Sequence, residues 1–134
     1  ARAKEVQKLA EKYITIAING YKDTVVVEKK KIVDGKETTV KAVNDGATKL
    51  AARRKLMAGL ADIQEVRLPK ETATEYKLRT KTVRHPLIEK MFNDYAPKFD
   101  AKASEKGQKG GYTAIYKMTQ RRGDGSEMAT IVVL

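Results

Sequence analysis

The chain has 134 residues, with 28 Lys and Arg against 17 Asp and Glu, and a formal net charge of +11. This length suits a single domain over residues 1–134. The absence of Cys excludes a disulfide scaffold, a thiolate metal site and a cysteine nucleophile, and it fits a reducing compartment. No apolar run approaches the ~18 residues of a membrane span, and the charged first nine residues do not resemble a secretory signal.

The excess of positive charge predicts a polyanionic partner. Lys and Arg attract phosphate backbones through Coulomb forces and counterion release, and this attraction requires no catalytic site. An anionic membrane would instead require an amphipathic helix whose apolar face stays free for lipid. Because the apolar faces of this chain are needed for its core, we expect nucleic acid rather than a membrane.

The first eighteen residues predict an amphipathic helix. Its apolar stripe recurs with the helical period and consists of Val6, Leu9, Ala10, Tyr13, Ile14 and Ala17. Asn19-Gly20 is expected to end this helix, with the glycine leaving it through a positive φ.

Residues 19–45 predict a β-hairpin arm inserted into the domain. Asp34-Gly35 lies between β-branched runs, which is a strong signal for a hairpin turn. Charged residues interrupt both faces of this hairpin, so we expect it to project from the body. Three consecutive lysines on the arm either meet RNA phosphates or guard a solvated strand edge; they are Lys29, Lys30 and Lys31.

A second helix is predicted over Ala47–Gln64, with Asn44 or Asp45 as its cap. The segment 67–84 that follows is polar and charged, and Thr74–Thr80 can form a short helical turn within it.

A third helix and two strands complete the chain. His85-Pro86 opens the helix, which Pro97 is expected to stop, and residues 100–111 are predicted as a loop whose start can be helical. Tyr112–Gln120 and Met128–Leu134 are the predicted strands. This order indicates an α+β fold with two layers, in which three main helices pack on a small mixed or antiparallel sheet and the hairpin protrudes. A lone two-stranded ribbon is marginal in water, so we expect another strand or a partner to cover it.

Little in the sequence suggests an enzyme. The single histidine, His85, precedes a proline, where a cap or loop role is expected rather than a general base. One His and no Cys leave neither a zinc site nor a Ser/His/Asp triad with its usual parts. Gly107–Gly111 lacks the following Lys-Ser or Lys-Thr and helix of a phosphate loop, and Arg122-Gly123-Asp124 is expected to be a hairpin turn. No catalytic residue, metal ligand or cofactor is therefore predicted.

Two pairs of arginines are candidates for RNA contact. Arg121 and Arg122 occupy the predicted turn between the last two strands, where guanidinium groups can make bidentate phosphate contacts. Arg53 and Arg54 fall inside the apolar arc of the second helix. They either reach RNA or form an internal salt bridge with an acid of the third helix, which offers Glu89 and Asp94.

The final third of the chain carries five short motifs, namely Pro86–Asn93, Ala96–Phe99, Gly110–Thr113, Arg121–Asp124 and Glu127–Ala129. Together these motifs resemble those of the bacterial large-subunit ribosomal protein L-seventeen family. Upstream, Ala3–Val6 with Ile14–Ala17 resembles the second helix of the family, and Ala51–Arg54 resembles its Ala-x-Arg-Arg helix. The resemblance covers residues 1–18 and 50–134 in the order of the family.

The chain departs from the family pattern in three respects. The family opens with a very basic segment, a helix and a strand, so the resemblance implies that this chain lacks that N-terminal segment. Residues 19–45 are an insertion relative to short members. Ala114 stands where the family has an arginine, and Thr119-Gln120 replaces a usual Gly-Pro.

The resemblance implies a cytoplasmic structural constituent of the large ribosomal subunit, with no catalytic step of its own. It would bind ribosomal RNA and stabilise the RNA fold near the outer rim of the peptide exit tunnel, beside neighbouring ribosomal proteins. Lys98 and Tyr112, which lie in matched motifs, join the four arginines as candidate RNA contacts. The alternative is a protein-interaction module that uses the arm or an open sheet edge to bind a ribosomal neighbour or a second copy.

Overall fold

A computed structural model describes residues 2–33, 36–107 and 109–134, excluding the side chains of residues 31, 33 and 36–38. It confirms the α+β class. The elements in chain order are α1 (Arg2–Gly20), β1 (Thr24–Val33), β2 (Lys36–Asp45), α2 (Ala47–Gly59), α3 (Ala73–Thr80), α4 (Pro86–Lys90), the π-helical turn η1 (Met91–Tyr95), α5 (Ala96–Lys106), β3 (Thr113–Lys117) and β4 (Ala129–Val133).

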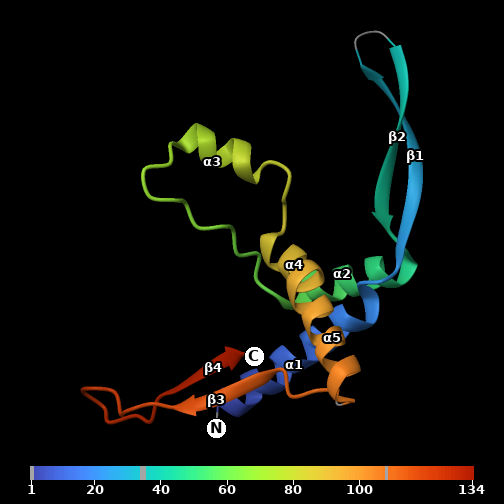
Figure 1. Cartoon of the computed structure of the whole chain (residues 1–134). Coiled ribbons are helices and arrows are strands. Elements are labelled where there is room, and N and C mark those ends of the chain that lie inside the picture. The colour runs from blue at the N-terminus through green and yellow to red at the C-terminus, as the bar shows by residue number, and fades with distance from the viewer. Residues whose placement is uncertain (1, 34–35, 108) are drawn as a thin grey trace.

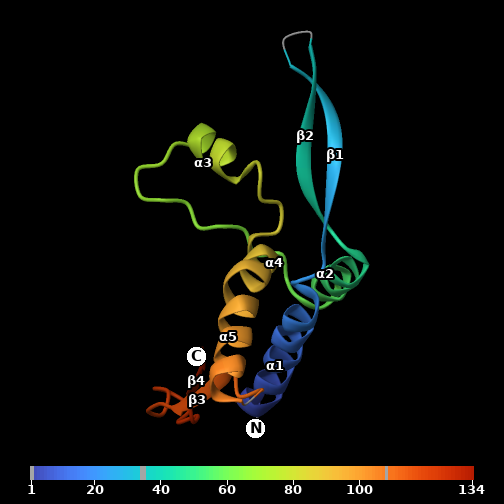
Figure 2. The same cartoon turned by 45° about the vertical axis from the view of Figure 1, so that its right-hand side comes forward.

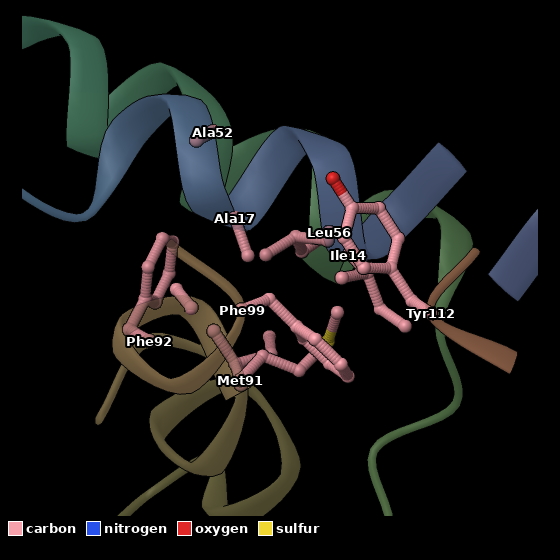
Figure 3. Packing of buried hydrophobic residues seen from close by; sticks show 10 residues of the cluster. Ile14, Ala17, Ala52, Leu56, Met91, Phe92, Phe99 and Tyr112 are labelled. Carbon is pink, nitrogen blue, oxygen red and sulfur yellow. The ribbon is translucent and has the colours of Figure 1, made fainter. Parts of the chain in front are cut away.

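The helical body is a small cluster with three extensions. α1 packs along α5 and η1, α2 crosses the end of α1, and the β3–β4 ribbon lies against α1 (Figures 1 and 2). The buried apolar residues of this body are Ile14, Ala17, Ala52, Leu56, Ile88, Met91, Phe92, Ala96, Phe99 and Tyr112. Figure 3 shows side chains from α1, α2, the η1 turn and α5 meeting in one core. The arm, the α3 excursion and the tip of the β3–β4 hairpin all extend beyond it.

The predicted first helix is confirmed, but the role expected for Gly20 is wrong. Gly20 is buried and is not among the described glycines with positive φ. A Cβ placed on it would lie 2.8 Å from the Cβ of Ala52, which is closer than side chains approach. The glycine is therefore needed because α2 crosses α1 at this point.

β1 and β2 form an antiparallel pair running from Thr24↔Asp45 to Val33↔Lys36, which is consistent with the predicted hairpin, while its expected turn at Asp34-Gly35 lies outside the described residues. Neither predicted side-chain cap of α2 is used. Gly46 is the N-cap residue, and the side chain of Asp23 accepts a hydrogen bond of 2.7 Å from the backbone N–H of Thr48.

The cap arises from the hairpin, whose two ends bring Asp23 beside Gly46. The carbonyl oxygen of Asp23 accepts a 2.9 Å hydrogen bond from the N–H of Gly46. A Cβ at Gly46 would lie 2.1 Å from the Asp23 carboxylate, so a larger residue there would displace the side chain that caps α2. The base of the arm and the start of α2 thus form one hydrogen-bonded junction.

The second helix is shorter than predicted, because it ends at Gly59 and the chain continues without regular structure before α3. The predicted helical turn near Thr74–Thr80 is confirmed as α3. Its first turn is closed by a capping box, in which Thr72 and Glu75 each accept a hydrogen bond from the backbone of the other.

The prediction that Pro97 stops the third helix is wrong. α4, η1 and α5 form one run, and the N–H of Ala96 donates to the carbonyl of Met91, five residues back. This wider turn comes directly before Pro97 and accommodates the proline, which has no N–H to donate to the preceding turn. The helix continues to Lys106 and ends at Gly107, whose φ is 65°. The predicted loop over residues 100–111 therefore begins as helix.

Arg53 forms the internal salt bridge that the sequence offered as one alternative. Its Nε lies 2.5 Å from Asp45 and its Nη1 lies 2.5 Å from Glu89. The guanidinium also stacks over the ring of Phe92, 5.2 Å from the centroid. The hydrogen bond from Arg53 and that from Lys49 lower the pKa of the Asp45 carboxyl, although its partial burial opposes the shift. One side chain thus joins β2, α2 and α4.

Replacing Gly20 by alanine should destabilise the protein by about 1–3 kcal/mol, because the added methyl group must push α2 away from α1. Gly59→Ala is the matched control, since its Cβ meets only the end of the Tyr13 side chain, which can move. Urea unfolding of both variants checks this expectation. Equal loss in the two variants would contradict the close-approach role of Gly20.

Replacing Asp45 by asparagine should lower the free energy of unfolding at neutral pH by about 1–3 kcal/mol. The folded pKa of Asp45 is depressed, so its contribution is present above the unfolded value of about 3.9 and is lost as pH falls through the folded value. Unfolding measured from pH 7 downwards should show a smaller acid loss in Asp45→Asn than in wild type. Parallel curves would show that the carboxylate contributes nothing.

Candidate nucleic-acid interface

The protein exposes far more surface than a compact chain of its mass. Its accessible surface is 10571 Å², whereas a compact protein of 14.9 kDa would expose about 7,000 Å². The excess comes from elements that leave the helical body, namely the arm, the α3 excursion and the C-terminal hairpin (Figure 1). Basic residues on these extensions are therefore open to a partner.

The lysines of the arm lie in its outer half. Lys29 pairs with Val40 and Lys30 with Thr39 across the ladder, so alternation places these two lysines on opposite faces. Both are exposed, whereas the side chain of Lys31 lies outside the described part of the chain. Val26 and Val43, paired nearer the base, are 61% and 68% exposed. The arm thus presents both charge and apolar surface outside the body.

The tip of the C-terminal hairpin is the predicted turn. Gly125 donates to the carbonyl of Arg121 at 3.1 Å, and Arg121 donates to the carbonyl of Ser126 at 2.9 Å. The Arg121 guanidinium pairs with Asp124, and the hydrogen bond from Arg121 is the main reason that the pKa of Asp124 lies well below its ordinary value. Arg122 is exposed and has no such pairing among the described residues.

The adjacent arginines of α2 have different surroundings. Arg53 is held by Asp45 and Glu89, as described above. Arg54 is exposed, and no acid or hydrogen-bond acceptor in the described structure contacts it. Arg54 is consequently the guanidinium of this pair that a phosphate can reach without breaking an ion pair.

Lys98 and Tyr112 differ in their exposure to solvent. Lys98 is exposed, and its Nζ donates to the carbonyl of Leu134 at 2.8 Å. Tyr112 is only 8% exposed, and its ring packs 4.8 Å from the ring of Phe99. Tyr112 is thus a core residue at the start of the C-terminal hairpin, and only its edge meets the surface.

Sequence reasoning missed a basic row on α5. Lys102 and Lys106 follow Lys98 at intervals of four residues, so all three lie on one helical face. Residues 100–111 were predicted as a loop, and that prediction concealed the row. The spacing of these lysines at i, i+4 and i+8 is the signal that could have revealed the row.

The described part of the structure shows neither a metal-ligand cluster nor a helix that could span a membrane. Among the residues that the structure describes, no group of three His, Cys, Asp or Glu side chains could hold a metal ion. His85 pairs with Asp62 at 3.2 Å, at the base of the α3 excursion. None of the described helices combines the length and apolar character needed to cross a membrane.

Comparison with known proteins gives one consistent result. The family model of ribosomal protein L17 matches residues 1–134. A protein of Lachnospira eligens named large ribosomal subunit protein bL17 is 35% identical, with 94% of this chain and 76% of the relative covered. Proteins of the same name from Ruminiclostridium cellulolyticum and Oenococcus oeni are 34% and 32% identical, each covering 98% of this chain, and 78% and 71% of their own lengths. The chain therefore belongs to the ribosomal protein L17 family.

Proposed function

We propose that this protein is a structural constituent of the large ribosomal subunit, that it binds ribosomal RNA and that it stabilises the RNA fold near the peptide exit tunnel. Membership of the L17 family supports the ribosomal role. The motif resemblance supports the location, and a net charge of +11 supports binding to RNA. In this role the protein acts in the cytoplasm, on the ribosome, and performs no catalytic step.

The observation that carries the proposal is the combination of excess surface with outward-facing basic residues. Extended elements with little packing of their own are stabilised when a partner covers them. Lys29, Arg54 and Arg122 are exposed on three separate parts of the structure. RNA recognised by its shape and backbone supplies phosphates at many such points, so the same contacts neutralise phosphates that folding brings together.

A second candidate function is supported by the apolar part of the arm. Val26, Val43 and Ile32 are largely exposed. Such residues suit contact with a neighbouring ribosomal protein or a second copy. Sedimentation of the isolated protein over a concentration series tests self-association, and a monomer at high concentration would contradict it.

The affinity of the whole chain for large-subunit ribosomal RNA fragments tests the proposal when it is measured across a salt series beside an unrelated duplex. Selective binding is expected, with a log–log salt slope of about −0.7 to −0.9 per phosphate neutralised. Equal, weak binding to both RNAs would contradict specific recognition by this chain.

Arg54→Ala should weaken binding to the RNA fragment and leave the unfolding free energy within about 0.5 kcal/mol of wild type. Arg53→Ala should instead destabilise the protein by about 1–3 kcal/mol, because it removes the cation shared by Asp45 and Glu89, of which only Asp45 keeps another partner, Lys49. Denaturant unfolding and RNA titration of both variants measure this difference. If the two variants behaved alike, the assignment of separate roles would be wrong.

The double change Arg121→Ala with Arg122→Ala should weaken RNA binding and flatten its salt slope by up to about 1.8, which corresponds to two phosphate contacts. The two single variants distinguish Arg121, which pairs with Asp124, from its exposed neighbour Arg122. Arg122→Ala should weaken RNA binding more than Arg121→Ala does. Titration over a salt series measures both quantities. An unchanged salt slope in the double variant would contradict a role for the hairpin tip in RNA binding.

A further inference from the structure

A recess of about 230 Å³ lies where the chain turns from α5 towards β3. It is lined by Phe99, Lys102, Lys106, Gly110, Gly111 and Tyr112. The two aromatic rings that line it belong to the core shown in Figure 3. The recess therefore borders the packed core, and its rim is basic.

The lysines at the rim form no ion pair with an acid in the described structure. Lys102 lies 6.0 Å from the centre of the Phe99 ring, and Lys106 is exposed with no partner in the described structure. Glu105 lies on the same helix but forms no ion pair with either lysine in the described structure. Positive charge therefore remains uncompensated at this edge of the recess.

The nearest acid towards the start of α5 is already neutralised. Asp100 pairs with Lys22 at 2.6 Å and accepts a hydrogen bond of 2.7 Å from the hydroxyl of Tyr21. Both contacts are made by Oδ2, and the charge of the carboxylate is balanced by Lys22. Asp100 therefore does not compete with an incoming anion for Lys102 or Lys106.

The opposite wall of the recess is bare backbone. Gly110 and Gly111 have φ of 106° and 63°, which L side chains rarely adopt. A Cβ built on either would meet nothing within 4 Å, so the space beside the main chain is open. A ligand can therefore approach the amide groups of both glycines as closely as hydrogen bonding requires.

We propose that this recess binds a backbone phosphate of RNA. Lys102 and Lys106 supply charge, the Gly110-Gly111 backbone allows close approach, and the buried rings of Phe99 and Tyr112 hold the two walls in place. The proposal rests on the RNA-binding function proposed above and adds to it a definite site. The row of Lys98, Lys102 and Lys106 along α5 suits successive phosphates of one RNA strand better than a single free anion, because neighbouring phosphates can meet neighbouring lysines.

Amide NMR spectra of the full chain test the site directly. A short single-stranded RNA is titrated against wild type, and inorganic phosphate is titrated separately. We expect the amide signals of Gly110 and Gly111 to shift and saturate as RNA is added. Inorganic phosphate should shift them only at much higher concentrations than RNA does. Equal responses to both, judged per phosphate, would show a free-anion site and overturn the RNA assignment.

Paired variants separate this site from general electrostatics. Lys102→Gln with Lys106→Gln should weaken the RNA response of the two glycines about tenfold at low salt. Lys8→Gln with Lys12→Gln is the matched control, because both lysines are exposed on α1 at the same spacing. Lys102→Arg with Lys106→Arg should retain the response, and it keeps the test valid if the glutamine variant folds poorly.

The outcomes distinguish this proposal from the proposed function. If wild type binds RNA while Gly110 and Gly111 stay unmoved, or if both glutamine variants lose affinity equally, the recess is not the site although RNA binding stands. If wild type binds no RNA, the proposed function itself fails. A loss confined to the Lys102 and Lys106 variant, with glycine shifts in wild type, supports the site.

Discussion

The close crossing of α1 and α2 at Gly20 and Ala52 is the contact on which the rest of the structure depends. It brings Ile14, Ala17 and Leu56 against the α4–η1–α5 run and so completes a core of ten buried apolar residues among those that the structure describes. A core of this size stabilises a compact helical body but cannot extend over 134 residues. The remaining elements are consequently attached to the body rather than packed into it.

The attachments are polar and local. Asp23 caps α2 and thereby ties the base of the arm to the body, while Asp45 holds Arg53 across the same junction. Arg79 plays a similar part within the α3 excursion, where it pairs with Glu65 and Glu71. Such contacts orient an extension without burying it, so its outer surface stays available to a partner.

Local pattern predicted the elements better than it predicted the contacts between them. Helical spacing predicted α1, and Asp-Gly between β-branched runs predicted the arm. The Asp23 cap depends on a residue twenty-five positions from Thr48, so no local signal could reveal it. The expected stop at Pro97 is wrong because a π-turn accommodates the proline, and the burial of Tyr112 depends on tertiary packing that no local pattern shows.

Hydrogen exchange, measured with and without large-subunit ribosomal RNA, tests the central claim that this small body carries extensions which RNA stabilises. The amides of α1, α2 and α5 should be protected in both states. Those of β1 and β2 should exchange fast in the free protein and become protected with the ribosomal RNA, but not with an unrelated duplex. Full protection of the arm in the free protein, or no change on binding, would contradict the account.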